Sequence, residues 1–409
     1  MKWASAMSHH LALDDSMGAC ARDLRAQLAI DPSASPRIGP AEVEPDLVLV
    51  FTSMHYVSQR DAVASALRAH FPKAVIFGCT GAGVIGAGHE AEEGAAVSVT
   101  AAHLPGVRLA PFHVDIDSMP SPDAPPEVWH RLVGLKPDLD PHFLLLADPF
   151  SLDAEALVGG LDFAFPGAAK IGGLASGAQR PGEHVLYLNA QAYRSGAVGI
   201  ALAGNIVADT VVAQGCRPIG EVMRVTEADR NTLVTLDGKP AIEVLQETFV
   251  TLDKRGQELA QRSLFLGIAM DPLIDQVQAG DFLVRNIMGA DTDRGALAVG
   301  ALLSEGQLVQ FHVRDAETSA DDLRSLLEAY RQGVRGLPAV GALLFSCTGR
   351  GRGLYGEADH DTGLFHDLVG ELPLGGFFCN GEIGPVAGTT HLHSYTSSFG
   401  LFRPRVTPD

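Results

Sequence analysis

Three cysteines lie at the ends of apolar segments and are the residues best suited to chemistry in this chain. Cys79 lies in VIFGCTGAG, Cys347 in GALLFSC and Cys379 in GGFFCNGEIG. A nucleophilic cysteine needs a base, usually histidine, near enough to stabilise the thiolate. The sequence does not place a histidine beside any of these cysteines. Buried thiols also serve as small apolar side chains. We therefore expect no catalytic residue and a protein that is not an enzyme.

A glycine pattern of the form G-x-G-x-x-G follows the first of these segments, at Gly81, Gly83 and Gly86. In a dinucleotide-binding turn, such glycines open a helix whose free amide groups hold the pyrophosphate. Here Gly88 and Gly94 interrupt the following residues, and a short β-rich segment comes next. The pattern therefore does not indicate a dinucleotide site.

Polar side chains set among glycines at the segment ends indicate a small-molecule site instead. Arg350 could hold a carboxylate through two parallel hydrogen bonds, and Glu382 could bind an amine or pair with an arginine. The glycines would let backbone approach a ligand, although they could equally form tight turns. The predicted ligand-binding residues are Cys79, Thr80, Gly81, Gly83, Gly173, Ser176, Cys347, Arg350, Cys379, Asn380 and Glu382.

Signals for a metal or a prosthetic group are weak. His391 and His393 would share one face of a strand and could chelate a metal with Cys379, but a third firm ligand is missing. The chain has no C-x-x-C-H motif, so any haem would be bound non-covalently. We expect no metal and no cofactor, with haem as the open alternative.

Four segments that resemble one another provide the elements to position these residues. Each has an apolar strand, a spacer, a second apolar strand closed by glycine and small polar residues, and another strand. The copies begin at Leu47, Phe143, Ser263 and Gly341. Helical patterns occupy 58–71, 239–249 and 318–330, with Thr318 or Ser319 as a plausible N-cap. Strands mixed with helices predict an α/β, or mixed α+β, fold.

The chain of 409 residues is long enough for two or three domains. We predict an N-terminal helical segment at 1–34 and two pseudo-related domains, at 35–236 and 237–409, built from the repeated strand-helix-strand-strand units. The boundary falls at the turn containing Asp237 and Gly238.

Charge and composition limit the partners and the compartment. The 30 basic and 49 acidic residues give a net charge of -19, which repels nucleic acid and anionic membranes. The acidic clusters HEAEEG and GEADHDTG are interpreted as solvated surfaces. Five widely spaced cysteines and the lack of a signal peptide predict a cytoplasmic protein, and no apolar segment is long enough to span a membrane.

Motifs along nearly the whole chain resemble those of the FIST family. They include FGCTGAGVIG, IGGLASG, QGCRPIG, LDGKPA, FLVRNIMGAD, LFSCTGRGRGLYGEADHD and GFFCNGEIGPVAG. The resemblance implies a bacterial protein with FIST N and FIST C domains that senses small ligands in signal transduction, with amino acids as suggested ligands. Some relatives bind haem and respond to nitric oxide. The resemblance supplies no catalytic residues, and a separate signalling partner protein is expected because no output segment is recognisable.

These observations favour a sensor that binds an amino acid or similar small metabolite between its two domains. The alternatives are an interaction scaffold without a ligand and a haem-based nitric oxide sensor. A cysteine-dependent enzyme ranks last.

Overall fold

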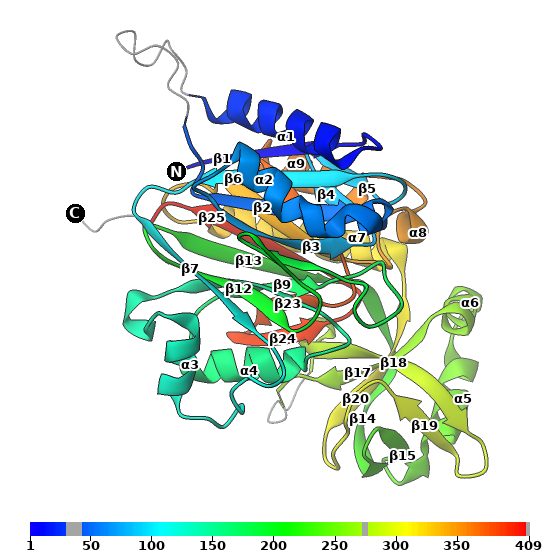
Figure 1. Cartoon of the computed structure of the whole chain (residues 1–409). Helices are drawn as coiled ribbons and strands as arrows, with labels where there is room; N and C mark the ends of the chain where they lie inside the picture. Colours follow the sequence, from blue (N-terminus) through cyan, green and yellow to red (C-terminus); the bar gives the residue numbers. More distant parts are fainter. Residues whose placement is uncertain (30–42, 272–276, 406–409) are drawn as a thin grey trace. The chain divides into compact units, whose positions relative to one another are not determined.

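The computed structural model describes residues 1–29, 43–271 and 277–405 (Figure 1). The chain forms two compact units. Unit 1 comprises residues 1–212, 324–392 and 396–409, and unit 2 comprises residues 213–323 and 393–395. The units therefore interleave along the sequence, whereas the predicted domains follow one another.

Unit 1 contains three sheets of six strands, and the first is built around the segment that begins at Leu47. Its parallel pair, β2 and β3, aligns Leu47 with Val75 and Ser53 with Gly81. The strand order is β1 (Lys2–Ser8), β6 (Val97–His103), β2 (Leu47–Ser53), β3 (Val75–Gly81), β10 (Leu186–Leu188) and β11 (Gln191–Tyr193).

The second and third sheets repeat this arrangement. The second has the order β7 (Val107–Val114), β12 (Ala197–Gly204), β8 (His142–Ala147), β9 (Lys170–Leu174), β23 (Glu382–Val386) and β24 (Thr389–His393). The third has the order β13 (Val207–Gln214), β25 (Thr396–Arg403), β21 (Gly341–Cys347), β22 (Leu374–Cys379), β4 (Val84–Gly86) and β5 (His89–Ala91). In each sheet the two middle strands are parallel.

The last two strands of each sheet come from a different repeat. After β3 of the first sheet, the chain supplies β4 and β5 to the third sheet. After β22 of the third sheet it supplies β23 and β24 to the second, and after β9 of the second it supplies β10 and β11 to the first. This cyclic exchange interlocks segments from the two halves of the sequence within unit 1.

One glycine in each repeat permits the close approach of the parallel strands. A β-carbon at Gly78, Gly172 or Gly376 would lie 1.8 Å from the carbonyl oxygen of the facing residue, which is Val50, Leu145 or Leu344 respectively. Such a contact is impossible without a shift of backbone. The three equivalent contacts show that the copies beginning at Leu47, Phe143 and Gly341 are structural repeats.

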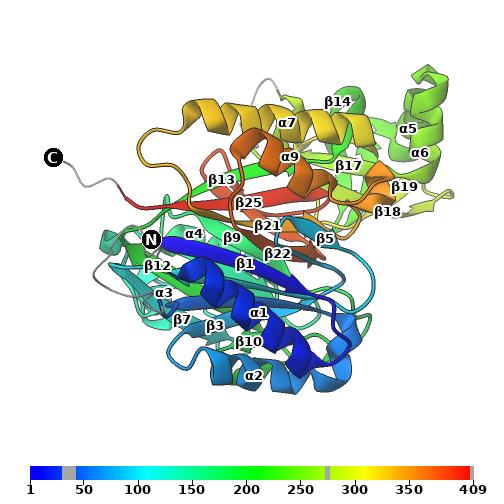
Figure 2. The ribbon, with the colours of Figure 1, turned by 90° about the horizontal axis from the view of Figure 1, so that it is seen from above.

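Helices cover the outer faces of the sheets, and Figure 2 shows α1 (Leu13–Leu28) and α2 (Val63–His70) beside the first sheet. In the second repeat, the side chain of Asp153 accepts a hydrogen bond from Ala156 N and caps the N-terminus of α4. The other helical elements of unit 1 are η2 (Met54–Ala62), α3 (Pro126–Val133), η3 (Pro137–Leu139), α4 (Ala154–Ala164), α8 (Arg352–Tyr355) and α9 (His360–Val369).

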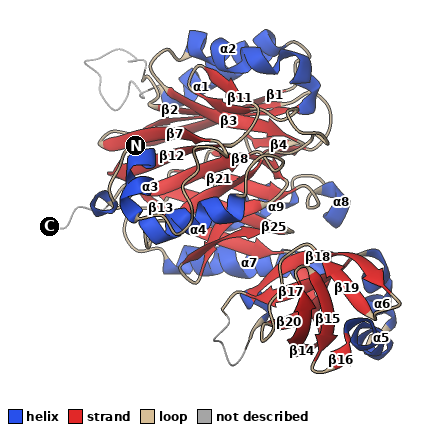
Figure 3. Ribbon diagram, turned by 60° about the horizontal axis from the view of Figure 1, so that its bottom comes forward, coloured by secondary structure: helices blue, strands red, loops and turns tan. Residues whose placement is uncertain are grey.

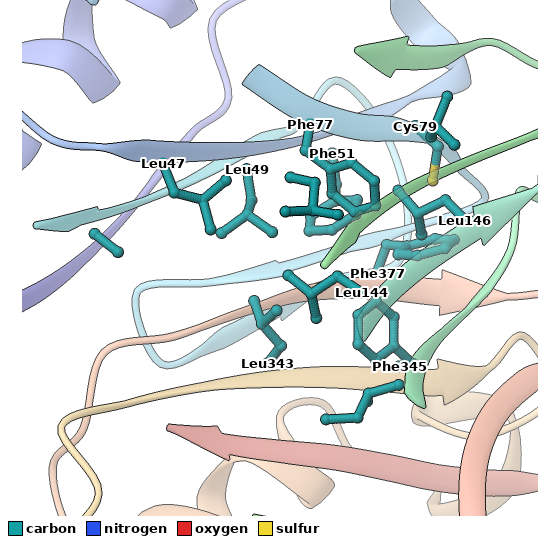
Figure 4. Packing of buried hydrophobic residues seen from close by; sticks show 14 of the residues in the cluster. Leu47, Leu49, Phe51, Phe77, Cys79, Leu144, Leu146, Leu343, Phe345 and Phe377 are labelled. Carbon is teal, nitrogen blue, oxygen red and sulfur yellow. The ribbon is translucent and has the colours of Figure 1, made fainter. Parts of the chain in front are cut away.

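Alternation along the strands produces two layers of core. Val48 and Val50 face the layer with α1 and α2, whereas Leu49 and Phe51 face a central cluster shared by all three repeats. In this cluster the rings of Phe51 and Phe377 stack with centroids 4.8 Å apart (Figure 4). Burial of large apolar side chains of this kind contributes about 1.5–3 kcal/mol each.

Unit 2 is an antiparallel sheet of seven strands (Figure 3). An additional pairing between β14 and β15 closes the sheet on itself. The unit also contains helices α5 (Ala241–Thr251) and α6 (Lys254–Arg262), the short η4 (Ala279–Asp281) and the first part of α7 (Ala316–Gly333). The strand order is β14 (Cys216–Asp229), β20 (Leu308–Arg314), β17 (Leu264–Ala269), β18 (Phe282–Asp291), β19 (Ala296–Val299), β15 (Thr232–Leu236) and β16 (Lys239–Pro240).

The structure confirms the mixed α/β fold and corrects one repeat. The copy expected from Ser263 consists of β17, β18 and β19, which pair antiparallel in sequence order. It therefore lacks the parallel pair that defines the three repeats of unit 1. The predicted N-terminal helical segment contains strand β1 as well as α1, and its residues 30–34 lie outside the described residues.

The predicted helices are present with shifted ends. The segment 58–71 is partly the 3-10 helix η2, and the segment 239–249 becomes α5 with Pro240 just before its first residue. Helix α7 (Ala316–Gly333) starts before the predicted cap, and the carboxylate of Asp315 accepts a hydrogen bond from Glu317 N at its beginning.

Candidate functional site

The predicted strand-end turns come together within unit 1. Leu174 N donates to Gly381 O at 2.8 Å, and Asn380 N donates to Leu174 O at 3.1 Å. A β-carbon at Gly173 would lie 2.5 Å from Cys379 Sγ. Turns of the second and fourth sequence copies therefore touch, although more than 200 residues separate them along the chain.

Ser176 joins the turns of all three repeats. Its hydroxyl donates to Phe378 O and accepts from Ala82 N at 2.8 Å. Its backbone N donates to Thr80 O at 3.3 Å, and the Thr80 hydroxyl accepts from Val185 N at 3.1 Å. The hydroxyls of Thr80 and Ser176 are thus used to hold the turns to one another.

The glycines of these turns make room for neighbouring protein atoms. A β-carbon at Gly81 would lie 2.8 Å from Gly83 O, and one at Gly83 would lie 2.7 Å from Ala91 O. Protein atoms therefore fill the space left by the missing side chains, and these glycines serve close packing of backbone.

The strand-end cysteines are buried thiols. Cys79, which Figure 4 shows, and Cys379 belong to the central apolar cluster, and Cys347 is also buried. Burial raises the pKa of the Cys79 and Cys379 thiols well above the usual value. Because the thiolate is the nucleophilic form, this environment opposes cysteine chemistry at both positions.

Arg350 lies in the interior and is held by a carboxylate of the same repeat. Its Nε donates to Asp361 Oδ2 at 2.7 Å and its Nη2 donates to Asp361 Oδ1 at 3.1 Å. Nη2 also donates to the Tyr355 hydroxyl at 2.6 Å. Burial opposes the charge, but the neighbouring Asp361 carboxylate outweighs it and raises the pKa of Arg350. Its guanidinium is therefore engaged within the protein.

The remaining predicted polar residues to place are Glu382 and Asn380. Glu382 is buried, and its Oε2 accepts from Thr396 N at 3.1 Å and from the Thr396 hydroxyl at 2.9 Å. The sequence left Glu382 either as a partner for Arg350 or Arg352 or as an acid of the turn, and the structure pairs Arg350 with Asp361. Asn380 is exposed.

Asp361 is the ionised carboxylate of a buried cluster. Besides Arg350, it accepts hydrogen bonds from Ser397 Oγ at 2.5 Å and from His360 Nδ1 at 3.0 Å. Burial alone would raise the pKa of Asp361, but the Arg350 charge and these hydrogen bonds lower it well below the usual value. The second carboxyl of the cluster, Glu90, has the opposite shift.

Glu90 is a buried carboxyl on the edge strand β5, with 8% of its surface exposed. Its Oε1 accepts from Thr362 N at 2.9 Å, in the first turn of α9. Among the described residues, its buried Oε2 has no hydrogen-bond partner. Burial, followed by the negative charge of Asp361, raises the pKa of Glu90 to about 8. A perturbed carboxyl of this kind marks a candidate functional site.

Glu90 lines a cavity of about 480 Å³, which we call the Glu90 cavity. Glu92 contacts the segment that contains Gly351 and Arg352, and its Oε1 accepts a hydrogen bond from Arg352 N at 2.8 Å. A β-carbon at Gly351, which has φ +63°, would lie 2.6 Å from the Glu92 carboxyl carbon. The lining residues are His9, Glu90, Ala91, Glu92, Glu93, Arg352, Gly353 and Ala358.

The sequence interpretation missed this cavity because it assigned both acidic clusters to solvated surfaces. Glu93 is exposed as expected, but Glu90 and Asp361 are buried. Two signals could have indicated the site: Glu90 and Glu92 are two residues apart and would share one face of an extended segment, and Asp361 follows the glycine-rich segment containing Arg350.

A second buried pair in unit 1 closes a turn of the second repeat. His184 Nδ1 lies 3.0 Å from Asp148 Oδ1, and His184 Nε2 accepts from Ala178 N at 3.2 Å. Ser151 Oγ donates to Asp148 Oδ2 at 2.6 Å. Because both ring nitrogens are engaged within the protein, the pair is suited to fixing the turn.

The described residues provide no group of three or more histidine, cysteine or acidic side chains placed to hold a metal ion. The Glu90 cavity also does not suit haem. Its three glutamates would repel the anionic propionates of haem. Within the described parts of the chain, no helix combines the length and apolar character needed to cross a bilayer.

Comparisons with known proteins agree with the sequence resemblance. An uncharacterised protein of Mycobacterium tuberculosis is 37% identical over 384 residues, which cover 93% of this chain and 97% of that protein. An uncharacterised protein of Mycobacterium bovis is 34% identical over 389 residues, covering 94% and 98% respectively. An F-box/LRR-repeat protein of Arabidopsis thaliana is 26% identical over 167 residues, covering 39% of this chain and 31% of that protein.

Family models match most of the chain. The FIST N domain matches residues 46–239 and the FIST C domain matches residues 241–385. The Glu90 cavity thus has one wall from each matched segment, with Glu90–Glu93 in the first and 352–358 in the second. The chain belongs to the FIST family, whose domains are associated with sensing in signal transduction.

Proposed function

We propose that this protein is a sensor that binds a small zwitterionic metabolite, most simply an amino acid, in the Glu90 cavity. The observation that carries the proposal is the buried Glu90 Oε2, which has no hydrogen-bond partner among the described residues and lines a cavity that also contains Arg352. A buried carboxyl oxygen without a partner is costly, and a ligand donor would remove that cost.

The cavity offers complementary groups for an amino acid. The exposed Arg352 can take a carboxylate through two parallel hydrogen bonds, and Glu90 can take the ammonium group. The volume of about 480 Å³ lies within the usual range for small-molecule sites. Arg352 and Glu90 thus replace Arg350 and Glu382 in the roles expected from the sequence.

Ligand binding in the cavity would affect α9 through the hydrogen bond between Glu90 and the start of that helix. The carboxyl that faces the ligand also accepts from Thr362 N, so a change in its charge alters a hydrogen bond at the start of that helix. A separate signalling protein would then recognise the occupied form. This route requires binding and no catalysis, in keeping with the raised pKa of Cys79 and Cys379. The free cysteines suit a reducing cytoplasm.

Thermal denaturation with each of the twenty amino acids tests the proposal. We expect at least one to raise the melting temperature, and the rise should grow with the logarithm of its concentration, since a ligand present at 100 times its Kd stabilises by about 2.7 kcal/mol. Arg352→Ala should abolish this shift. The matched control Arg331→Ala, an exposed arginine on α7, should retain it.

Two results would contradict the proposal. One is the absence of stabilisation by any amino acid, which would favour an interaction scaffold without a ligand. The other is an unchanged shift in Arg352→Ala, which would place the ligand elsewhere.

A further inference from the structure

The charges around Glu90 restrict which amino acid the cavity could take, and this step rests on the proposed function. The lining includes the acidic side chains of Glu90, Glu92 and Glu93, and one guanidinium, that of Arg352. A ligand with a single ammonium and a single carboxylate would leave an excess of negative charge. A second ammonium group would reduce that excess.

The groups facing Glu90 from neighbouring elements keep this environment acidic. At the start of α9, Asp359 Oδ1 accepts from Glu90 N at 2.6 Å, and Asp359 Oδ2 lies 3.0 Å from His89 Nδ1. The negative charge of Asp361 also raises the pKa of Glu90, although that charge is paired with Arg350. The remaining titratable or charged groups around the site are His9, Glu92, Glu93, Arg352, His360 and His366.

The empty site holds a proton where a cation would bind. Thr362 N donates to Glu90 Oε1, so the proton of the neutral carboxyl belongs on Oε2, the oxygen without a protein partner among the described residues. With a pKa of about 8, Glu90 is largely neutral at pH 7. An ammonium group can form an ion pair with the same oxygen only when Glu90 is ionised.

We infer that the Glu90 cavity selects amino acids with a side-chain ammonium group, such as L-lysine or L-ornithine, and exchanges the Glu90 proton for that cation. In this exchange the neutral Glu90 carboxyl releases one proton to solvent, and the resulting carboxylate forms an ion pair with a ligand ammonium group, which keeps its own three protons. The ligand carboxylate pairs with Arg352, and its second ammonium group lies among the remaining glutamates.

Isothermal titration with L-lysine in two buffers of different ionisation enthalpy measures the released protons. At pH 7 we expect about 0.9 proton per lysine bound, from a group with a pKa of about 8. The dissociation constant should fall about tenfold between pH 6 and pH 7, because the ionised fraction of Glu90 rises about tenfold. The side-chain ammonium of lysine keeps its charge throughout this range. L-leucine should bind about tenfold more weakly than L-lysine, and L-glutamate more weakly still.

Glu90→Gln is the test variant, because its amide oxygen can still accept from Thr362 N while no proton is left to release. Its proton release and pH dependence should both vanish. The exposed Glu371→Gln is the matched control and should behave as wild type. The wild-type pH profile and proton count remain decisive even if Glu90→Gln does not fold.

The outcomes separate this inference from the proposed function. Equal affinity for L-leucine and L-lysine, or lysine binding without proton release, overturns the inference and leaves the amino-acid sensor intact. A pH dependence that persists in Glu90→Gln assigns the proton to another group, such as His9, and also overturns it. If no amino acid binds, the proposed function fails together with the inference.

Discussion

The negative charge of Asp361 raises the pKa of Glu90 and is itself paired with Arg350. Asp361→Asn is the perturbation that removes this charge. Both side chains are almost completely buried, with 0% and 2% exposed. Removing one partner of a buried ion pair usually costs about 3–5 kcal/mol, because the other charge is left uncompensated. The asparagine oxygen can still accept one hydrogen bond from Arg350, so we expect a loss of about 3 kcal/mol.

Urea denaturation followed by tryptophan fluorescence measures this loss. The two tryptophans of the chain, Trp3 and Trp129, are buried in unit 1, so the signal reports the unit that contains the pair. With a slope of about 3 kcal/mol per M, the midpoint should fall by about 1 M. Asp367→Asn, an exposed aspartate on α9, is the matched control and should shift the midpoint little.

A double-mutant cycle distinguishes charge pairing from loss of packing. If the pair interacts as described, Arg350→Met combined with Asp361→Asn should cost at least about 2 kcal/mol less than the sum of the single changes. The pKa of Asp361 is lowered in the folded protein, so its stabilising contribution exists above its unfolded pKa and is lost as pH falls below about 4. A loss under about 0.5 kcal/mol for Asp361→Asn, or strictly additive effects, would refute the reasoning.

Three further predictions concern packing, pH and thiol reactivity. Gly376→Ala should destabilise unit 1 by on the order of 3 kcal/mol in urea denaturation, because its β-carbon would lie 1.8 Å from a carbonyl oxygen; Gly363→Ala, with open space around it, should not, and equal effects would contradict the packing account. Burial lowers the pKa of His312 to about 4, so unit 2 should lose stability as pH falls from 6.5 to 4. Hydrogen exchange of β17 and β20 should show this loss in wild type and not in His312→Phe. Alkylation of Cys79 and Cys379 should be far slower in native than in denatured protein, and rapid native labelling at pH 7 would contradict the raised thiol pKa.

The sequence pattern predicted the repeated unit because its signals are local. Apolar strands closed by small residues identified the copies at Leu47, Phe143 and Gly341, and the helical patterns located α2, α5 and α7 to within a few residues. The copy at Ser263 resembled them in composition, but parallel and antiparallel pairing differ in the relative direction of the paired strands and in their hydrogen-bond pattern. Periodicity along one strand does not contain that information.

The exchange of hairpins and the burial of the acidic residues depend on contacts between distant segments. Glu90 and Asp361 lie 271 positions apart in the sequence, and Glu90 reaches the first turn of α9 only because β4 and β5 join the third sheet. Local composition made both acids resemble surface residues. The predicted turns at Thr80, Ser176 and Cys379 do meet, but packed protein atoms occupy the space that the sequence interpretation assigned to a ligand.

A crystal structure of the protein soaked with L-lysine tests the central claim most directly. We expect lysine in the Glu90 cavity, with an ammonium nitrogen within hydrogen-bonding distance of Glu90 Oε2 and the carboxylate on the Arg352 guanidinium. Lysine bound at another site, or an empty cavity in which Glu90 Oε2 is hydrogen-bonded to protein, would contradict it.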